Sequence, residues 1–263
     1  MELYGASWQK ISFEPVPLKR EYMYVQGEVH IFCSRVPEEI NVIEQWLSLS
    51  GIEKAHFSSK ESLSSHRLVS LFMRYFLGAL CLKESPGNLR FRRTPAGKPS
   101  LWVSGNPVPL HFSQSHTRDY VLTAVGDMEC GIDVESIRSP LAYPRLVHRG
   151  LPGEWRVELD ATRGEAASAH LFTSYWTALE SLFKMTGGSS FISFLRTLAQ
   201  DSDVPAKKER LAGVWGASFD LDGNHLACLT ALRRPDKLHC FSMSTTSMSD
   251  FPQLARLEKG SMK

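Results

Sequence analysis

The stretch GIDVESI, residues 131–137, places two carboxylates two positions apart in an apolar frame. Side chains alternate between faces in a strand, so Asp133 and Glu135 point to one face and the apolar residues to the other. Two carboxylates this close repel each other unless a proton or a cation lies between them. The pattern therefore predicts a strand whose acidic face is either solvated or holds a cation.

Helices and further strands are predicted on both sides of this stretch. The apolar spacing predicts helices over residues 38–50, 61–82 and 170–185. Alternating, β-branched runs predict strands over residues 28–36, 89–93, 109–113, 120–125 and 130–135. A hairpin is predicted over residues 214–232, where Asp222-Gly223 supplies the turn signal. Residues 138–163 have no clear period and are predicted to be irregular.

The two halves of the chain have similar patterns. Each has a long helix and a pair of strands, and DYVLTAV (119–125) resembles NHLACLTAL (224–232). We therefore expect an α+β fold of two similar α/β lobes with pseudo-twofold symmetry, each with a long helix packed on a small antiparallel sheet. The predicted domains are an N-terminal lobe at 1–140, a C-terminal lobe at 141–240 and a flexible tail at 241–263.

Composition is that of an ordinary globular protein. The 263 residues are 43% hydrophobic with a formal net charge of +2, and the pI is near 8.3. This mild positive charge suits a phosphate-bearing ligand or an acidic partner but falls short of a nucleic-acid-binding signature. Nucleic-acid binding through Arg90, Arg92 and Arg93, the densest basic cluster, would show a steep salt dependence. We expect no nucleic-acid partner.

The cysteines and the N-terminus favour a cytoplasmic protein. The five cysteines are scattered without CxxC or zinc-type spacing, so we expect reduced, mostly buried thiols. The first ten residues lack the charged and apolar regions of a signal peptide. The most apolar stretch, 69–82, contains Arg74 and is too short to span a bilayer. We therefore expect a cytoplasmic location and no membrane partner.

A stripe of three functional residue types runs along the predicted helix at 170–185. Trp176, Glu180 and Lys184 are spaced four apart and so share one helix face. A surface Glu–Lys pair with a packed tryptophan explains this stripe equally well, and such a pair contributes only about 0.2–0.5 kcal/mol.

Cationic and hydroxyl side chains stand at three other places. Lys98 lies in a Gly-Pro turn with Arg93 upstream, a setting that holds a cation rigidly. Ser115 and His116 come at the end of a predicted strand, and Arg67 lies in an apolar helix, where an unpaired guanidinium is costly. Taken singly, each has an ordinary structural explanation as turn chemistry or a basic surface.

The order of these motifs is more specific than any one of them. Along the chain come HR in a helix, GKP, F-x-x-S-H, G-I-D-V-E and W-x-x-x-E-x-x-x-K-x-x-G. This order resembles the 4′-phosphopantetheinyl transferases, in particular the larger, monomeric, two-lobed type that serves peptide, polyketide and fatty-acid synthases. The resemblance covers residues 54–190 clearly and extends loosely to about 232. It implies a holo-[acyl-carrier-protein] synthase activity.

What the resemblance implies is a defined reaction. Family members transfer the 4′-phosphopantetheine arm of coenzyme A to a serine of an apo acyl or peptidyl carrier protein and release adenosine 3′,5′-bisphosphate. The ion is Mg²⁺, or Mn²⁺, and the family positions that surround it are Asp133, Glu135 and Glu180. Three carboxylates suit such a hard cation. The expected partners are coenzyme A and carrier proteins, and the expected state is a monomer.

The resemblance also assigns roles to other side chains. The expected catalytic residues are Asp133, Glu180 and Lys184. The positions expected to bind the phosphates of coenzyme A are Arg67, Arg93, Lys98, Ser115, His116 and Lys184, with Lys54 as a loosely aligned addition. A site rich in cations suits phosphoryl transfer, which depends mainly on positioning and electrostatics.

The sequence departs from the family pattern at two positions. Ser113 stands where the family usually has Asn, which changes a hydrogen bond that supports a turn. Leu179 stands where Lys is common, which removes a cation next to Glu180. These departures leave open an alternative, a catalytically weakened module that binds coenzyme A or a carrier protein. Because the acids, Lys98, His116 and Lys184 are all present, an active enzyme is favoured.

Overall fold

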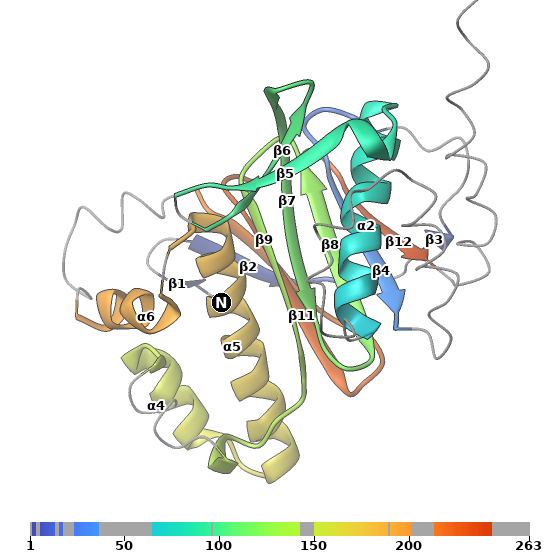
Figure 1. Ribbon diagram of the computed structural model, residues 1–263. Helices are drawn as coiled ribbons and strands as arrows, with labels where there is room; N and C mark the ends of the chain where they lie inside the picture. The colour runs from blue at the N-terminus through green and yellow to red at the C-terminus, as the bar shows by residue number, and fades with distance from the viewer. Residues whose placement is uncertain are drawn as a thin grey trace, which may run out of the picture. The chain divides into compact units, whose positions relative to one another are not determined.

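The structure is a computed structural model, shown in Figure 1. The residues that it describes are 2–3, 6–13, 16–17, 24–36, 65–95, 97–142, 150–188, 190–200 and 213–243. The helix predicted over 38–50, the loosely aligned Lys54 and residues 244–263 of the predicted tail lie outside the described residues.

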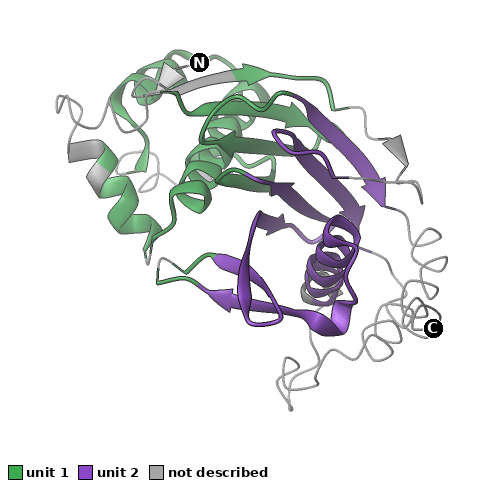
Figure 2. Cartoon of the chain, turned by 90° about the horizontal axis from the view of Figure 1, so that it is seen from above, with its two compact units in different colours: residues 1–13, 94–98, 128–236 green, residues 14–93, 99–127, 237–263 purple. Residues whose placement is uncertain are grey.

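The chain forms two compact units, coloured separately in Figure 2. Unit 1 consists of Met1–Phe13, Thr94–Lys98 and Met128–Asp236. Unit 2 consists of Glu14–Arg93, Pro99–Asp127 and Lys237–Lys263. Each unit therefore combines segments that are distant in the sequence. The lobe boundaries proposed from the sequence and the pseudo-twofold relation remain predictions.

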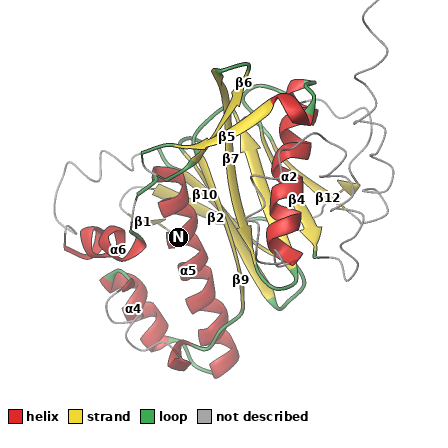
Figure 3. Ribbon diagram, in the orientation of Figure 1, coloured by secondary structure: helices red, strands yellow, loops and turns green. Residues whose placement is uncertain are grey.

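Unit 1 is a five-stranded sheet with a long helix packed on it. In sheet order the strands are β1 (Glu2–Leu3), β2 (Ala6–Lys10), β10 (Trp215–Asp220), β11 (His225–Ala231) and β9 (Cys130–Ser136). Helix α5 (Glu165–Thr186) packs against β9 and β11 (Figure 3). Its buried side chains, among them Phe172 and Leu182, form the core of this unit with Cys228 of β11. The helix predicted over 170–185 is thus present and begins five residues earlier.

Unit 1 has two shorter α-helices among its described residues. Helix α4 (Gly153–Ala161) lies within the region for which the sequence predicts irregular structure, and α6 (Phe191–Gln200) follows α5. Both contact α5. Helix α4 buries only Trp155 and Leu159, four residues apart. An apolar pattern of two residues is too short to indicate a helix, which explains why the sequence does not predict α4.

Unit 2 is a seven-stranded sheet with its own long helix. In sheet order the strands are β3 (Val16–Pro17), β12 (Leu238–Met243), β4 (Val29–Arg35), β8 (Tyr120–Gly126), β7 (Asn106–His116), β6 (Pro99–Val103) and β5 (Leu89–Arg93). Helix α2 (Ser65–Leu82) packs against β8, β7 and β5. Val69, Phe72 and Phe76 of α2 form the core of this unit with Phe112 of β7.

The two sheets are mixed, whereas the sequence predicts small antiparallel ones. Strand β2 lies parallel to β10, and β12 lies parallel to β4 and β3. The remaining pairs within the described residues are antiparallel. The parallel pairs join segments that are far apart in the chain, and no tight turn forces such segments to run antiparallel. The α+β class predicted from the sequence is confirmed.

Three further observations on the described residues concern the cysteines, the helices and the predicted hairpin. None of the five cysteines forms a disulfide, and Cys33, Cys130 and Cys228 are buried. None of the helices that the structure describes has the length and apolar character needed to cross a membrane. The hairpin β10–β11 is present with Asp222 and Gly223 in its connection, as predicted.

Candidate functional site

The backbones of β9 and α5 come unusually close at Gly131. A Cβ atom at this position would lie 2.0 Å from the carbonyl oxygen of Ser181 and 2.5 Å from the backbone nitrogen of Met185. The Ser181 hydroxyl also makes a buried hydrogen bond with the Thr230 hydroxyl of β11, at 2.6 Å. Only glycine permits this approach without displacing the helix. The close approach places side chains of the strand and the helix in the same small space.

Three carboxylates meet there, and we call them the acidic cluster. Asp133 and Glu135 come from β9, and Glu180 comes from α5. One oxygen of each lies within 4.8 Å of the others. Asp133 is only 1% exposed, and the two glutamates are half-buried. The sequence predicts that the strand acids share a face, and the structure brings Glu180 to that face.

The acidic cluster is electrostatically strained when no cation is bound. Burial raises the pKa of Glu180 to about 7, and the nearby charge of Asp133 adds to the effect. Burial likewise raises the pKa of Glu135 to about 6, with a further contribution from Asp133. Like charges in a partly buried site disfavour simultaneous ionisation. A divalent cation would remove this repulsion, and three carboxylates match the oxygen ligands that Mg²⁺ prefers.

Two basic side chains border the acidic cluster. Lys184, one turn after Glu180 in α5, donates a hydrogen bond from Nζ to Oδ1 of Asp133 at 2.7 Å. Its side chain is 28% exposed, so it also reaches the surface. Arg138 forms an ion pair with Glu135 from the segment after β9. The stripe predicted along the helix therefore contacts the strand acids rather than forming an isolated surface pair.

Lys98 occupies a tight turn in unit 1. The Thr94 amide donates to the Lys98 carbonyl at 2.8 Å, and Gly97 has a φ of +81°. The Lys98 Nζ donates to the carbonyl oxygen of Met185 at 2.6 Å and forms an ion pair with Glu129. Burial lowers the pKa of this lysine. Carbonyls in the last turn of a helix carry partial negative charge, which helps to hold a cation there.

The other predicted phosphate-binding residues lie in unit 2. Arg67 is in the first turn of α2, and Arg93 is the last residue of β5. Ser115 and His116 end β7, with Ser115 buried and His116 exposed. The structure thus brings Asp133, Glu135, Glu180 and Lys184 together in unit 1. Lys98, in the same unit, contacts Met185, the residue that follows Lys184 in α5.

The two departures from the family pattern have different surroundings. Leu179 is fully buried and packs in the hydrophobic core of unit 1. An ammonium group in that core would lose its hydration without a compensating charge, so leucine fits this position. Ser113 is buried in β7 opposite Ala124 of β8. Neither substitution displaces a carboxylate of the acidic cluster.

Sequence reasoning missed three residues of this site. Gly131 sets the approach of strand and helix, while Arg138 and Glu129 pair with predicted site residues. Glu129 and Arg138 lie beside the GIDVE stretch, so the only available signal was their position in the sequence.

A surface pocket of about 550 Å³ also lies in unit 1, apart from these residues. Its lining includes Lys10, Glu158, His170 and Tyr175. The predicted site residues are absent from its lining, so its size gives no reason to move the candidate site there.

A strand and a helix bring three carboxylates to one point, with an ammonium group beside them, and this arrangement is a candidate divalent-cation site. Residues 129–228, which contain the whole acidic cluster and Lys184, match the family model of the 4′-phosphopantetheinyl transferase superfamily. Over this segment the chain is similar to the 4′-phosphopantetheinyl transferase superfamily.

A curated relative has the same family name. The chain is 32% identical over 117 residues to the 4′-phosphopantetheinyl transferase HetI of Nostoc sp. (strain PCC 7120 / SAG 25.82 / UTEX 2576). The matched region covers 44% of this chain and 48% of the relative. The chain therefore spans about half the length of the curated relative that it matches.

Proposed function

We propose that this protein is a Mg²⁺-dependent 4′-phosphopantetheinyl transferase that modifies apo acyl or peptidyl carrier proteins. Its substrates would be coenzyme A and a carrier-protein serine, and its products would be the holo carrier protein and adenosine 3′,5′-bisphosphate. The similarity of residues 129–228 to the superfamily supports the reaction class. The larger, monomeric, two-lobed type and a cytoplasmic location are part of the same proposal.

The acidic cluster is the observation that carries this proposal. Three carboxylates offer oxygens within 4.8 Å of one another, and burial together with the charge of Asp133 raises the pKa of Glu180 to about 7. A bound divalent cation would favour the ionised form of all three. The donor set contains oxygen only, which favours Mg²⁺ or Mn²⁺ over softer metals. When bound, such an ion supplies charge neutralisation at the pyrophosphate of coenzyme A.

The side chains of this chain would divide the remaining work. Asp133, Glu135 and Glu180 would hold the ion, and Lys184 would bind a phosphate oxygen when it exchanges its Asp133 contact for the substrate. Lys98 would hold another phosphate and would exchange its Glu129 contact in the same way. The phosphate-binding roles predicted for Arg67, Arg93, Ser115 and His116 are part of the same proposal.

The transfer itself would be a displacement at the β-phosphorus of coenzyme A. The serine oxygen forms a new P–O bond, and the bond from that phosphorus to the adenosine bisphosphate oxygen breaks. The serine proton passes to a base, and Glu180 is the candidate, directly or through water. A carboxylate beside Mg²⁺ has a low pKa and is a weak base. We therefore rank its ligand role above its role as a base.

The test is intact-mass analysis of several apo carrier proteins after incubation with coenzyme A and Mg²⁺. We expect each modified protein to gain the mass of one phosphopantetheine group, and we expect no gain in EDTA. Asp133→Asn should abolish the gain, whereas Asp160→Asn, an exposed acid of α4, should keep it. Binding of coenzyme A by the wild type without any transfer would favour the alternative, a binding module.

A further inference from the structure

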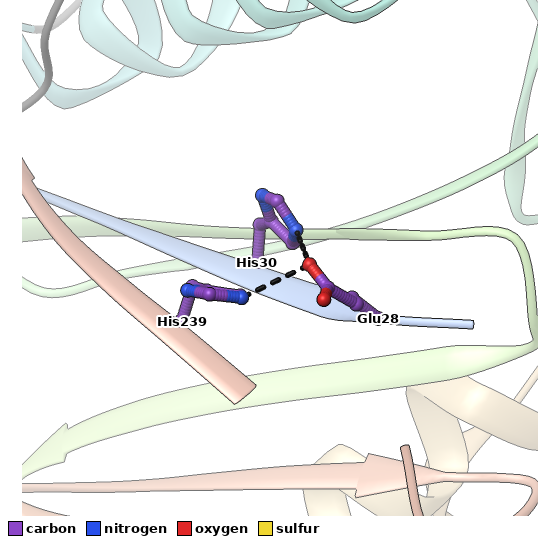
Figure 4. Close-up of side chains that lie close together, drawn as sticks. All are labelled: Glu28, His30 and His239. Atoms are coloured by element: carbon purple, nitrogen blue, oxygen red, sulfur yellow. Dashed lines mark hydrogen bonds and ion pairs between the residues drawn. The ribbon is translucent and has the colours of Figure 1, made fainter. Parts of the chain in front are cut away.

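A second group of metal-ligating side chains lies in unit 2, on neighbouring strands. Glu28 immediately precedes β4, His30 lies within β4, and His239 lies in β12. The two strands are parallel neighbours, with His239 directly opposite His30. Glu28 is two residues before His30 and so shares its face of the sheet. Figure 4 shows the three side chains pointing toward one another.

The ligand atoms of this group converge on one carboxylate oxygen. Nε2 of His30 lies 3.2 Å from Oε2 of Glu28, and Nε2 of His239 lies 2.9 Å from the same oxygen (Figure 4). All three ligand atoms lie within 4.8 Å of one another. In a tetrahedral zinc site with bonds of about 2.0–2.1 Å, ligand atoms are about 3.3 Å apart. The two separations between imidazole nitrogen and carboxylate oxygen are therefore already close to those of a zinc site.

The surroundings combine a buried anion with a solvent-facing side. The side chains of Glu28 and His30 are 9% and 2% exposed, whereas His239 is 38% exposed. Burying a carboxylate is costly unless positive charge or hydrogen bonds compensate it. The Lys237 ammonium is 4.0 Å from Glu28 and 71% exposed, so solvent screens much of its charge. The exposed side at His239 gives an ion a path in and room for a water ligand.

We propose that Glu28, His30 and His239 form a binding site for a divalent transition-metal ion of the Zn²⁺ type. Two imidazoles and one carboxylate favour zinc and its neighbours, whereas Mg²⁺ and Ca²⁺ prefer oxygen ligands alone. Cys240 is adjacent to His239 in β12, so its side chain points to the opposite face of the sheet. A bound ion would join β12 to β4 and stabilise unit 2.

This proposal is independent of the proposed transferase function. Its residues lie in unit 2, whereas the acidic cluster lies in unit 1. Its donors include nitrogen, whereas the acidic cluster offers oxygen only. The alternative is a hydrogen-bonded group without metal, in which the two imidazoles stabilise the Glu28 carboxylate. The two alternatives differ in one measurable quantity, the zinc that the folded protein retains.

The experiment equilibrates the full-length protein with Zn²⁺ in excess Mg²⁺, dialyses it against Mg²⁺ buffer and measures retained zinc by mass spectrometry. We expect one zinc per wild-type chain and none in His239→Ala, whose side chain is the most exposed of the three. Zinc should be retained in three controls: His170→Ala, Cys240→Ser and Asp133→Asn. No zinc in the wild type, or equal zinc in His239→Ala, would overturn the proposal.

A second measurement keeps the proposal testable if a variant folds poorly. Competition with a chelator should show Zn²⁺ affinity at least about tenfold weaker in Glu28→Gln, because even the loss of a side chain that only hydrogen-bonds a metal ligand weakens metal binding by about 10–100-fold. In a separate thermal-unfolding experiment, Zn²⁺ should raise the melting temperature of the wild type but not that of His239→Gln. A similar rise in both proteins would show that zinc binds elsewhere.

Discussion

Replacing Glu180 by Gln should stabilise the metal-free protein while it removes the response to Mg²⁺. The substitution keeps the shape of the side chain and one oxygen but removes one of three neighbouring negative charges. Burial disfavours the ionised Glu180 carboxylate, and the nearby charge of Asp133 adds to this, so the metal-free folded state carries an electrostatic cost that the variant lacks. The same lost charge weakens the site for a divalent ion.

The pKa of Glu180 sets the size and sign of this effect. Its rise from 4.5 to about 7 corresponds to roughly 3 kcal/mol, at about 1.4 kcal/mol per tenfold change in the ionisation equilibrium. Because the carboxylate is partly exposed and water screens it, we expect on the order of 1–2 kcal/mol. The folded state binds this proton more tightly than the unfolded state. The cost is therefore small below pH 4.5, grows between pH 4.5 and 7, and is complete above pH 7.

Thermal unfolding in EDTA at pH 5 and pH 8 measures the difference. At pH 8 the melting temperature of Glu180→Gln should exceed that of the wild type by about 3–6 °C, and at pH 5 the difference should be smaller. Added Mg²⁺ should raise the melting temperature of the wild type much more than that of the variant. Asp160→Asn is the matched control and should follow the wild type. A variant that is less stable than the wild type at pH 8 in EDTA would refute the reasoning.

Three further predictions concern substitutions of the strand acids, of two basic residues and of Gly131. Asp133→Ala should abolish Mg²⁺-dependent transfer, with Glu135→Ala less severe, because Asp133 is the more deeply buried acid; full activity of Asp133→Ala in Mg²⁺ would show that the strand acids are structural. Lys98→Ala and Arg67→Ala should raise the KM for coenzyme A more than they lower kcat, because they would bind phosphates in the ground state; steady-state kinetics with an unchanged KM and a collapsed kcat would contradict this. Gly131→Ala should destabilise the protein by about 1–3 kcal/mol or more in urea denaturation, because its Cβ would overlap the backbone of α5; unchanged stability would mean that the helix does not need this close approach.

Period and spacing predicted the two long helices and the β10–β11 hairpin of the described residues. The long apolar helices and the Asp222-Gly223 hairpin have strong local signals, and each occurs in the structure. The parallel pairs β2–β10 and β12–β4 depend on contacts between distant segments, which no local pattern encodes. For the same reason the mixed character of the sheets could not be predicted.

The sequence predicted the acids of the candidate site, but it did not predict the backbone contact that brings them together. Alternation put Asp133 and Glu135 on one face, and helical spacing put Glu180 in line with Lys184. The close approach of β9 and α5 depends on Gly131, because a Cβ atom at this position would overlap the backbone of α5. The sequence alone does not show this contact. The Glu28, His30 and His239 group was not predicted, because its third member joins through the pairing of β12 with β4.

The central claim is that Glu180 and the strand acids hold the cation that supports phosphopantetheinyl transfer. The most direct test compares the transfer rates of wild type and Glu180→Gln to one apo carrier protein at saturating coenzyme A and Mg²⁺, followed by intact mass. We predict a loss of at least about a hundredfold, the lower range for a positioned acid–base group, while calorimetry still detects coenzyme A binding. A near wild-type rate in Glu180→Gln would contradict both the ligand role and the base role.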